Sequence, residues 1–438
     1  MVKLKHKIDK LANGLTLLRV AVPGVESVAT LVLANTGSRY EQKSQYGMAH
    51  FFEHMAFKGT TKYPSSELVA SAIDGIGADF NAFTSTEYTG YYIRSSAKSV
   101  EKALDVLSEM LAAPLLKQDD IEREKGVIIE ELNMYKDLPQ ARVGELFEKM
   151  VLAGSTLEHP IIGEKATIMA MNSDGFRAWL KDWYDASNLT LVMAGEVETV
   201  ESKQLLTLVE KYFGATPQRH KNPPHEQFLS KKFIYNGGFV YEEMPIEQAH
   251  FVLGWPGLKL SDEKQPVSTI LTTIFGGSMS SRLFTQVREK RGLAYYISAS
   301  DSSCHDSGLL TAQAGVNLDK TAEAVEVTLT EFMRAATGEG AVTEGELARA
   351  KDYLRGKQAL FLENTLAVAQ SYGLRQMLLG EVLTPAEKLA QIEAVTVEEV
   401  NALVRELCQS KQTKLAVVGR LADRQVADLE KLSGRFQA

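Results

Sequence analysis

The chain has 438 residues, of which 45% are hydrophobic and 24% charged, so its composition excludes a disordered or fibrous protein and fits two or three globular domains. Its 48 basic and 56 acidic residues give a net charge of -8, and no Lys/Arg-rich run suits a phosphate backbone, so we expect no nucleic-acid partner. No apolar run spans a membrane, no signal peptide or presequence is visible, and only Cys304 and Cys408 are present, so we expect a cytoplasmic protein without disulfides or a membrane partner.

The first predicted elements are two strands over residues 14–22 and 28–37, where branched apolar residues are bounded by turn residues. A helical pattern follows over residues 47–58 and is apolar nearly all round, which predicts a buried helix. Ionisable residues in such a helix need partners, because an unpaired buried charge is strongly unfavourable.

This helix carries His50, Glu53 and His54 among its apolar residues. At about 100° per residue, all three side chains project into one sector of the helix. Imidazoles one turn apart chelate a metal ion, and the order HxxEH is the inverzincin zinc signature. The alternative is that both histidines are core residues with hydrogen-bond partners, and a third ligand would decide in favour of a metal.

Residues 77–93 form the next predicted β-rich segment. By alternation, Phe80, Ala82 and Thr84 fall on one side of the strand. At the edge of a sheet, such a strand would bind an extended peptide through main-chain hydrogen bonds. The alternative is a strand inside a hairpin with no open edge.

A charged helix is predicted over residues 116–137, with Ile121 on its buried face. Glu131 falls on the flank of that face and is the expected third metal ligand, whereas a solvated charge is the alternative. Glu124 lies on the same flank, and we expect it to assist catalysis either by supporting a ligand or by replacing one.

Features of the first half of the chain return about 220 residues later, which indicates a duplication. The strand pattern of residues 189–197, for example, is repeated at residues 414–421. We therefore predict an α+β protein with two duplicated domains, each a mostly antiparallel sheet packed with helices. The predicted ranges are a metal-binding catalytic domain at 1–213, a proline-containing linker at 214–232 and a second domain at 233–438.

The motif HFFEH at residues 50–54, with Glu131 after 76 intervening residues, resembles the zinc signature of the pitrilysin-type metallopeptidases. In length and motif, the chain resembles the two-domain branch that includes the β subunit of mitochondrial processing peptidase and bacterial homologues. The resemblance implies one Zn²⁺ per chain, held by His50, His54 and Glu131. It also implies hydrolysis of peptide bonds by a metal-activated water, with Glu53 as the general base.

The resemblance further implies which residues bind substrate and what the second domain contributes. The strand that matches the family's substrate strand comprises Phe80, Asn81, Ala82, Phe83 and Thr84. The second copy has no HxxEH, but its Arg288 and Tyr295 resemble an Arg/Tyr pair that family members direct toward the active site. There the tyrosine would stabilise the oxyanion and the arginine would hold a substrate carbonyl.

Because the metal motif and the Arg/Tyr pair occur in one chain, we expect a homodimer. The resemblance implies an enclosed chamber, which would restrict the substrates to short or unfolded peptides. The alternative is a catalytically inactive subunit, or one that is active only within a heterodimeric processing peptidase, since the family includes such members.

Overall fold

The computed structural model describes residues 4–219 and 225–435. Residues 220–224 of the predicted linker lie outside the described residues. Within the described ranges, no helix combines the length and the apolar character needed to cross a bilayer. The chain forms two compact units, each assembled from three segments. The first unit comprises Met1–Leu132, His159–Phe228 and Lys357–Glu387, and the second comprises Asn133–Glu158, Leu229–Gly356 and Lys388–Ala438.

The first unit is built on a six-stranded sheet with the order β1-β2-β6-β3-β5-β4. β2 and β6 are parallel, and the other neighbours are antiparallel. Both faces of the central strands are buried because apolar residues occupy successive positions along them. The strands are β1 (Lys5–Lys10), β2 (Thr16–Ala21), β3 (Ser27–Ala34), β4 (Asp79–Thr84), β5 (Thr89–Ser96) and β6 (Leu189–Gly195).

Most helices of the first half of the chain gather against one face of this sheet, where they form the larger apolar core of the unit. These helices are α1 (Met48–Met55), α2 (Ser66–Asp74), α3 (Val100–Ala112), α4 (Gln118–Asp137), α6 (Lys165–Ala170), α7 (Ser173–Trp183), α8 (Val197–Glu201) and α9 (Lys203–Phe213). Short helical turns are η1 (Ser38–Tyr40), η2 (Lys43–Gln45), η3 (Ala97–Ser99), η4 (Ala186–Asn188) and η5 (His225–Phe228).

The second unit has a five-stranded sheet with the order β7-β11-β8-β10-β9. Its strands follow the order of the first sheet without β1, and β7 is parallel to β11 as β2 is to β6. The shared topology agrees with the predicted duplication. The strands are β7 (Phe239–Glu243), β8 (Gln248–Pro256), β9 (Ala294–Ser303), β10 (Gly308–Asn317) and β11 (Lys414–Gly419).

The second sheet is covered on one face by α10, α11 and α15, which enclose the second large apolar core. The helices of the second half of the chain are α10 (Gln265–Gly276), α11 (Thr321–Thr337), α12 (Glu344–Phe361), α13 (Thr365–Leu379), α14 (Pro385–Ala394), α15 (Val397–Leu407) and α16 (Asp423–Arg435). Short helical turns are η6 (Phe284–Glu289), η7 (Leu318–Lys320) and η8 (Ser410–Gln412).

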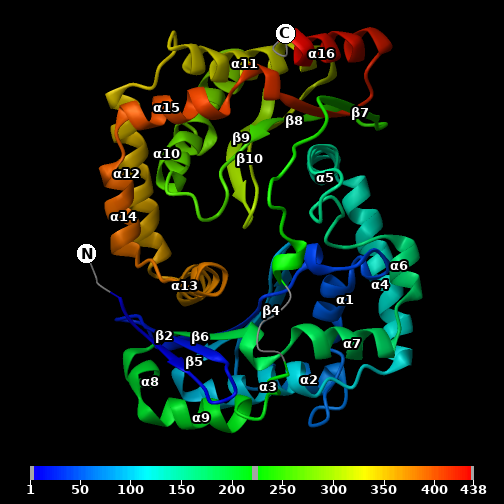
Figure 1. The fold of residues 1–438 in the computed structure, drawn as a ribbon, viewed down its shortest axis with the longest axis vertical. Coiled ribbons are helices and arrows are strands. Elements are labelled where there is room, and N and C mark those ends of the chain that lie inside the picture. Colours follow the sequence, from blue (N-terminus) through cyan, green and yellow to red (C-terminus); the bar gives the residue numbers. More distant parts are fainter. Residues whose placement is uncertain (1–3, 220–224, 436–438) are drawn as a thin grey trace. The chain divides into compact units, whose positions relative to one another are not determined.

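The remaining face of each sheet is covered by a helix from the opposite half of the chain (Figure 1). α13 packs on β3 and β6 of the first sheet, where Val368 and Tyr372 join the apolar cluster of Leu31 and Val192. α5 (Pro139–Val151) packs on β8 and β11 of the second sheet through Phe147. The compact units are therefore discontinuous and differ from the continuous ranges predicted from the sequence, because each half buries the apolar face of a helix on the other half's sheet.

Candidate metal centre

The helix that carries the HxxEH residues is fixed at its N-terminus by a buried carboxylate. Glu41 accepts hydrogen bonds from the backbone N–H groups of Gly47 and Ala49, at 2.8 and 2.7 Å. These are among the first N–H groups of α1, which have no partner within the helix. Gly47 has a φ of 94°, and a Cβ at this position would lie 2.6 Å from the carbonyl oxygen of Ile162. The entry into α1 therefore requires glycine.

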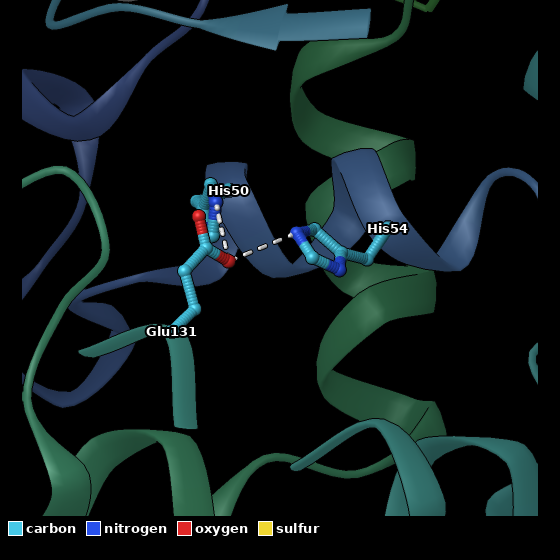
Figure 2. Close-up of side chains that lie close together, drawn as sticks. All are labelled: His50, His54 and Glu131. Carbon is cyan, nitrogen blue, oxygen red and sulfur yellow. Dashed lines mark ion pairs between the residues drawn. The ribbon is translucent and has the colours of Figure 1, made fainter. Parts of the chain in front are cut away.

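His50, His54 and Glu131 converge from α1 and α4 within the first unit. Oε2 of Glu131 lies 3.7 Å from Nε2 of His50 and 3.5 Å from Nε2 of His54, and Figure 2 shows the carboxylate between the two rings. One ligand atom from each residue lies within 4.8 Å of the others. The three residues predicted as metal ligands are thus brought together. In the described part of the chain, they are the group of His, Cys, Asp or Glu residues whose ligand atoms lie close enough to hold one metal ion.

These separations suit a bound metal ion better than direct hydrogen bonds. Two ligand atoms at about 2.1 Å from a tetrahedral metal lie roughly 3.4 Å apart, which is close to the observed 3.5 and 3.7 Å. The side chains are 12%, 22% and 23% exposed for His50, His54 and Glu131, so a water molecule can reach the site. Two imidazoles and one carboxylate are a donor set of catalytic zinc sites.

Glu124 lies behind His54 and is not part of the ligand cluster. Its Oε1 is 2.9 Å from Nδ1 of His54, and its Oε2 is 2.5 Å from Nζ of Lys58. Because the carboxylate is buried and ionised, Nδ1 of His54 donates a hydrogen bond to it, and Nε2 is the nitrogen that faces the cluster. Of the two roles predicted for Glu124, the geometry matches the support of a ligand.

The charges around the cluster shift the acid strength of its members. Burial lowers the pKa of His54, but the hydrogen bonds and negative charges of Glu124 and Glu131 outweigh this effect and raise it to about 9. The rings of His50 and His54, which lie 3.7 and 3.5 Å from its carboxylate, lower the pKa of Glu131 to about 2. Burial opposes ionisation of Glu124, yet its bonds to His54 and Lys58 lower its pKa overall. The ionised carboxylate of Glu131 is thus available to a cation at neutral pH.

Glu53 is held beside the cluster by the strand at the edge of the sheet. Oγ1 of Thr84 donates a hydrogen bond to Oε2 of Glu53 over 2.5 Å. Glu53 belongs to the same helix as His50 and His54 but is not a member of the ligand cluster. A carboxylate next to a metal site and free of the metal is suited to accept a proton from water.

The strand that contains Thr84 is the edge strand β4, which pairs only with β5 among the described strands. The alternative of an interior strand is therefore wrong. The ring centroid of Phe80 lies 5.7 Å from that of Phe57, in the turn that follows α1. The N–H of Ala82 donates to Oδ1 of Asn81 at 2.9 Å, a local bond available to a strand N–H at an open edge. Phe83 is half-buried and packs against the apolar cluster of Leu31 and Val192.

Arg288 and Tyr295 lie together in the second unit. Arg288 belongs to η6, a turn of π-helix, and Tyr295 is the second residue of β9, an edge strand. The guanidinium carbon of Arg288 is 4.8 Å from the ring centroid of Phe284 and 6.0 Å from that of Tyr295. Tyr295 is 75% exposed, which is unusual for a residue with so large a side chain.

Two supporting residues were not predicted from the sequence. Lys58 follows His54 by one helical turn, so its place beside a carboxylate that supports this ligand could have been found from helical spacing. Glu41 precedes α1, and no periodicity connects it to the N–H groups that it caps.

Comparison with known proteins agrees with this fold. Residues 19–165 match the model of the family described as insulinase (peptidase family M16), and residues 170–354 match the peptidase M16 inactive domain. The chain is 35% identical over 400 residues to the uncharacterized zinc protease YmxG of Bacillus subtilis, covering 90% of this chain and 94% of that protein. It is 33% identical to an uncharacterized zinc protease of Streptomyces coelicolor, covering 98% and 94%.

Solved structures share the fold at lower sequence identity. A protease from Helicobacter pylori matches with a TM-score of 0.87 at 20% identity, over 95% of this chain and all of that one. A peptidase M16 inactive domain from Pseudomonas fluorescens matches with a TM-score of 0.86 at 18% identity, over 96% and 98%. The fold is that of two-domain α+β proteins of this kind, and it holds a candidate metal centre. The chain belongs to peptidase family M16.

Proposed function

We propose that this chain is a zinc-dependent endopeptidase. The observation that carries the proposal is the convergence of His50, His54 and Glu131 at metal-ligand spacing, with the carboxylate of Glu53 beside them on the same helix. The zinc protease names of the bacterial relatives support zinc as the metal, with one ion per chain. The described part of the chain offers the three protein ligands that catalytic zinc sites use.

When bound, zinc supplies Lewis acidity that lowers the pKa of a water molecule and polarises the scissile carbonyl. Glu53 accepts the proton of the attacking water and passes it to the leaving amine. The hydroxyl of Thr84 orients Glu53 by its hydrogen bond to Oε2. Glu124 fixes the ring of His54 and keeps Nε2 unprotonated once a metal binds.

We propose that the substrates are extended or unfolded peptides that pair with β4. This strand ends at Thr84, the residue bonded to Glu53, so a peptide on its edge runs past the general base. Main-chain pairing supplies affinity without regard to side chains. It requires the Ala82 N–H to exchange its bond to Asn81 for one to the peptide.

The role of the second unit and the oligomeric state are part of the same proposal. Tyr295 would stabilise the oxyanion and Arg288 would hold a substrate carbonyl. The exposure of Tyr295 and its contact with Arg288 support a role in binding rather than in the core. We propose a homodimer, because one chain carries both the ligand cluster and the Arg/Tyr pair.

The experiment that tests the proposal is cleavage of a quenched fluorescent library of extended peptides by the purified chain and by Glu53→Gln, each with and without a chelator. Glu130→Gln is the matched control, because Glu130 is an exposed carboxylate next to Glu131. We expect cleavage that is lost on chelation, restored by zinc, absent in Glu53→Gln and retained in Glu130→Gln.

Zinc-loaded, folded protein that cleaves no peptide would overturn the proposal of a self-sufficient enzyme. In that case the chain would be a non-catalytic subunit, or one that is active only with a partner, and proteins that copurify with it would be sought.

A further inference from the structure

A cavity of about 430 Å³ lies in the first unit and has no part in the proposed chemistry. Its volume is within the range of small-molecule sites. The cavity is formed where the ends of α3, α7 and α9 meet the loop after α3. Its apolar lining comes from Leu111, Leu115, Leu180, Leu189, Phe213 and Pro217.

The charged lining of this cavity is entirely basic, and none of the residues that line it is acidic. Arg177 and Lys181 stand one turn apart on α7, and Arg219 approaches from the segment after α9. Within residues 4–219 and 225–435, no carboxylate forms an ion pair with any of the three cations. One N–H of Arg177 donates to the carbonyl oxygen of Leu115 at 3.2 Å, and its other donors stay available.

This combination of an apolar lining and unpaired cations has a specific chemical complement. The three cations are exposed side chains at the edge of this cavity, and an anion bound among them is attracted by all three charges. Guanidinium groups match carboxylates in geometry, while apolar walls favour a hydrocarbon body. The complementary ligand is a small amphipathic carboxylate.

Tyr184 connects this cavity to both parts of the proposed active site. Tyr184 is among the residues that line the cavity, and its ring centroid lies 4.8 Å from that of Phe52, the neighbour of Glu53 on α1. Its hydroxyl is 2.7 Å from that of Tyr91 on β5, and Tyr91 is the register partner of Ala82 on β4. A ligand bound against Tyr184 therefore contacts a residue that packs both on the metal helix and on the strand that pairs with the edge strand.

We propose that this cavity is an effector site for an amphipathic carboxylate, either a fatty acid or the C-terminal residue of a peptide. The bound carboxylate ligand packs against Tyr184 and orders α1 and β4, which raises peptidase activity. The effector role rests on the proposed function, whereas the binding of the anion does not.

The experiment measures binding and activity separately on the full chain. Calorimetry with decanoate and with N-acetyl-leucyl-leucine tests the two sources of the carboxylate, and decanol and the corresponding peptide amide are their neutral controls. We expect at least one acid to bind more tightly than about 1 mM and its neutral control to bind at least tenfold more weakly. The bound acid should raise kcat/KM for a fluorogenic peptide by about fivefold.

Two variants keep the test specific to the cavity. Lys181→Glu reverses one of its charges and should weaken binding at least tenfold, and Ala112→Phe should abolish binding by filling the space. Lys203→Glu, at the opposite end of α9, is the charge-matched control and should bind as the wild type does.

Equal binding of acid and neutral control, or unchanged binding by Lys181→Glu, would overturn the anion site. Binding that leaves kcat/KM unchanged in an active, zinc-loaded preparation would overturn the effector role. A preparation without any peptidase activity would instead contradict the proposed function, and calorimetry would still decide the anion site.

Discussion

The hydroxyl of Thr84 donates a hydrogen bond to the carboxylate of Glu53 over 2.5 Å, which joins the end of the edge strand to the metal helix. Because the bond orients the group proposed as general base, Thr84→Val should lower kcat about tenfold or more while leaving zinc content unchanged. Steady-state kinetics and metal analysis measure the two effects. Thr84→Ser keeps the hydroxyl and should retain most of the activity, and an equal loss in both variants would contradict a role of the bond.

Glu124 should control metal affinity without being a ligand. Glu124→Gln replaces the carboxylate that accepts the proton of His54 Nδ1, so the affinity for zinc should fall about 10- to 100-fold. Competition with a chromophoric chelator measures this change. Glu130→Gln removes an exposed carboxylate of the same helix and should leave the affinity as it is. Equal affinities in wild type and Glu124→Gln would show that Glu124 has no part in the site.

Metal binding should depend on pH through His54. Burial lowers the pKa of His54, but Glu124 and Glu131 raise it to about 9 in the metal-free chain, so the ring is protonated at neutral pH. A proton must leave before Nε2 binds a metal, so the apparent zinc affinity should fall about tenfold for each unit that the pH decreases below about 9. Glu131, with a pKa of about 2, stays ionised throughout this range.

This competition predicts the release of about one proton per zinc bound near pH 7, which calorimetry in buffers of different ionisation enthalpy detects. An apparent affinity that is independent of pH between about 7 and 8 would contradict the assignment.

Glu41 should stabilise the first unit by capping the metal helix. Glu41→Ala removes the acceptor of two buried N–H groups and should lower the free energy of unfolding by about 2–4 kcal/mol. Urea denaturation followed by the fluorescence of Trp179 and Trp183, which lie in the same unit, measures the loss. Glu41→Gln keeps one acceptor oxygen and should lose less. A variant as stable as the wild type would show that water replaces the cap.

Tyr295 should act in catalysis and not in metal binding. If its hydroxyl stabilises the oxyanion, Tyr295→Phe should lower kcat about 10- to 100-fold with zinc content unchanged. The neighbouring Tyr296, whose hydroxyl is 3.1 Å from Nδ1 of His250, provides the control variant Tyr296→Phe, which should keep its turnover. Full activity of Tyr295→Phe would remove this residue from the mechanism.

The predicted fold class and the ligand cluster depended on patterns that are local in the sequence. Alternation, helical periodicity and the repeat were sufficient for two α+β halves, and the angular positions of His50, His54 and Glu131 on their helices placed these residues on facing flanks. Helical geometry is set by neighbouring residues, so such positions follow from sequence alone.

The features that escaped prediction depend on contacts between segments distant in sequence. The bond from Thr84 to Glu53 requires the edge strand to pass α1, and the cap by Glu41 requires a turn with a left-handed Gly47. The sequence did not predict that α5 and α13 each pack on the sheet of the opposite half of the chain. An apolar face shows that a helix is buried, but it does not show which sheet the helix packs against.

The packing of α13 on the first sheet affects the order in which the protein can fold during synthesis. The first sheet emerges from the ribosome early, yet the helix that covers its second face, α13, begins only at Thr365. Until then, an apolar sheet surface that includes Leu31 and Val192 has no cover from its own chain. A nascent chain stopped before α13 should therefore depend on chaperones and aggregate readily, although it already contains every residue of the ligand cluster.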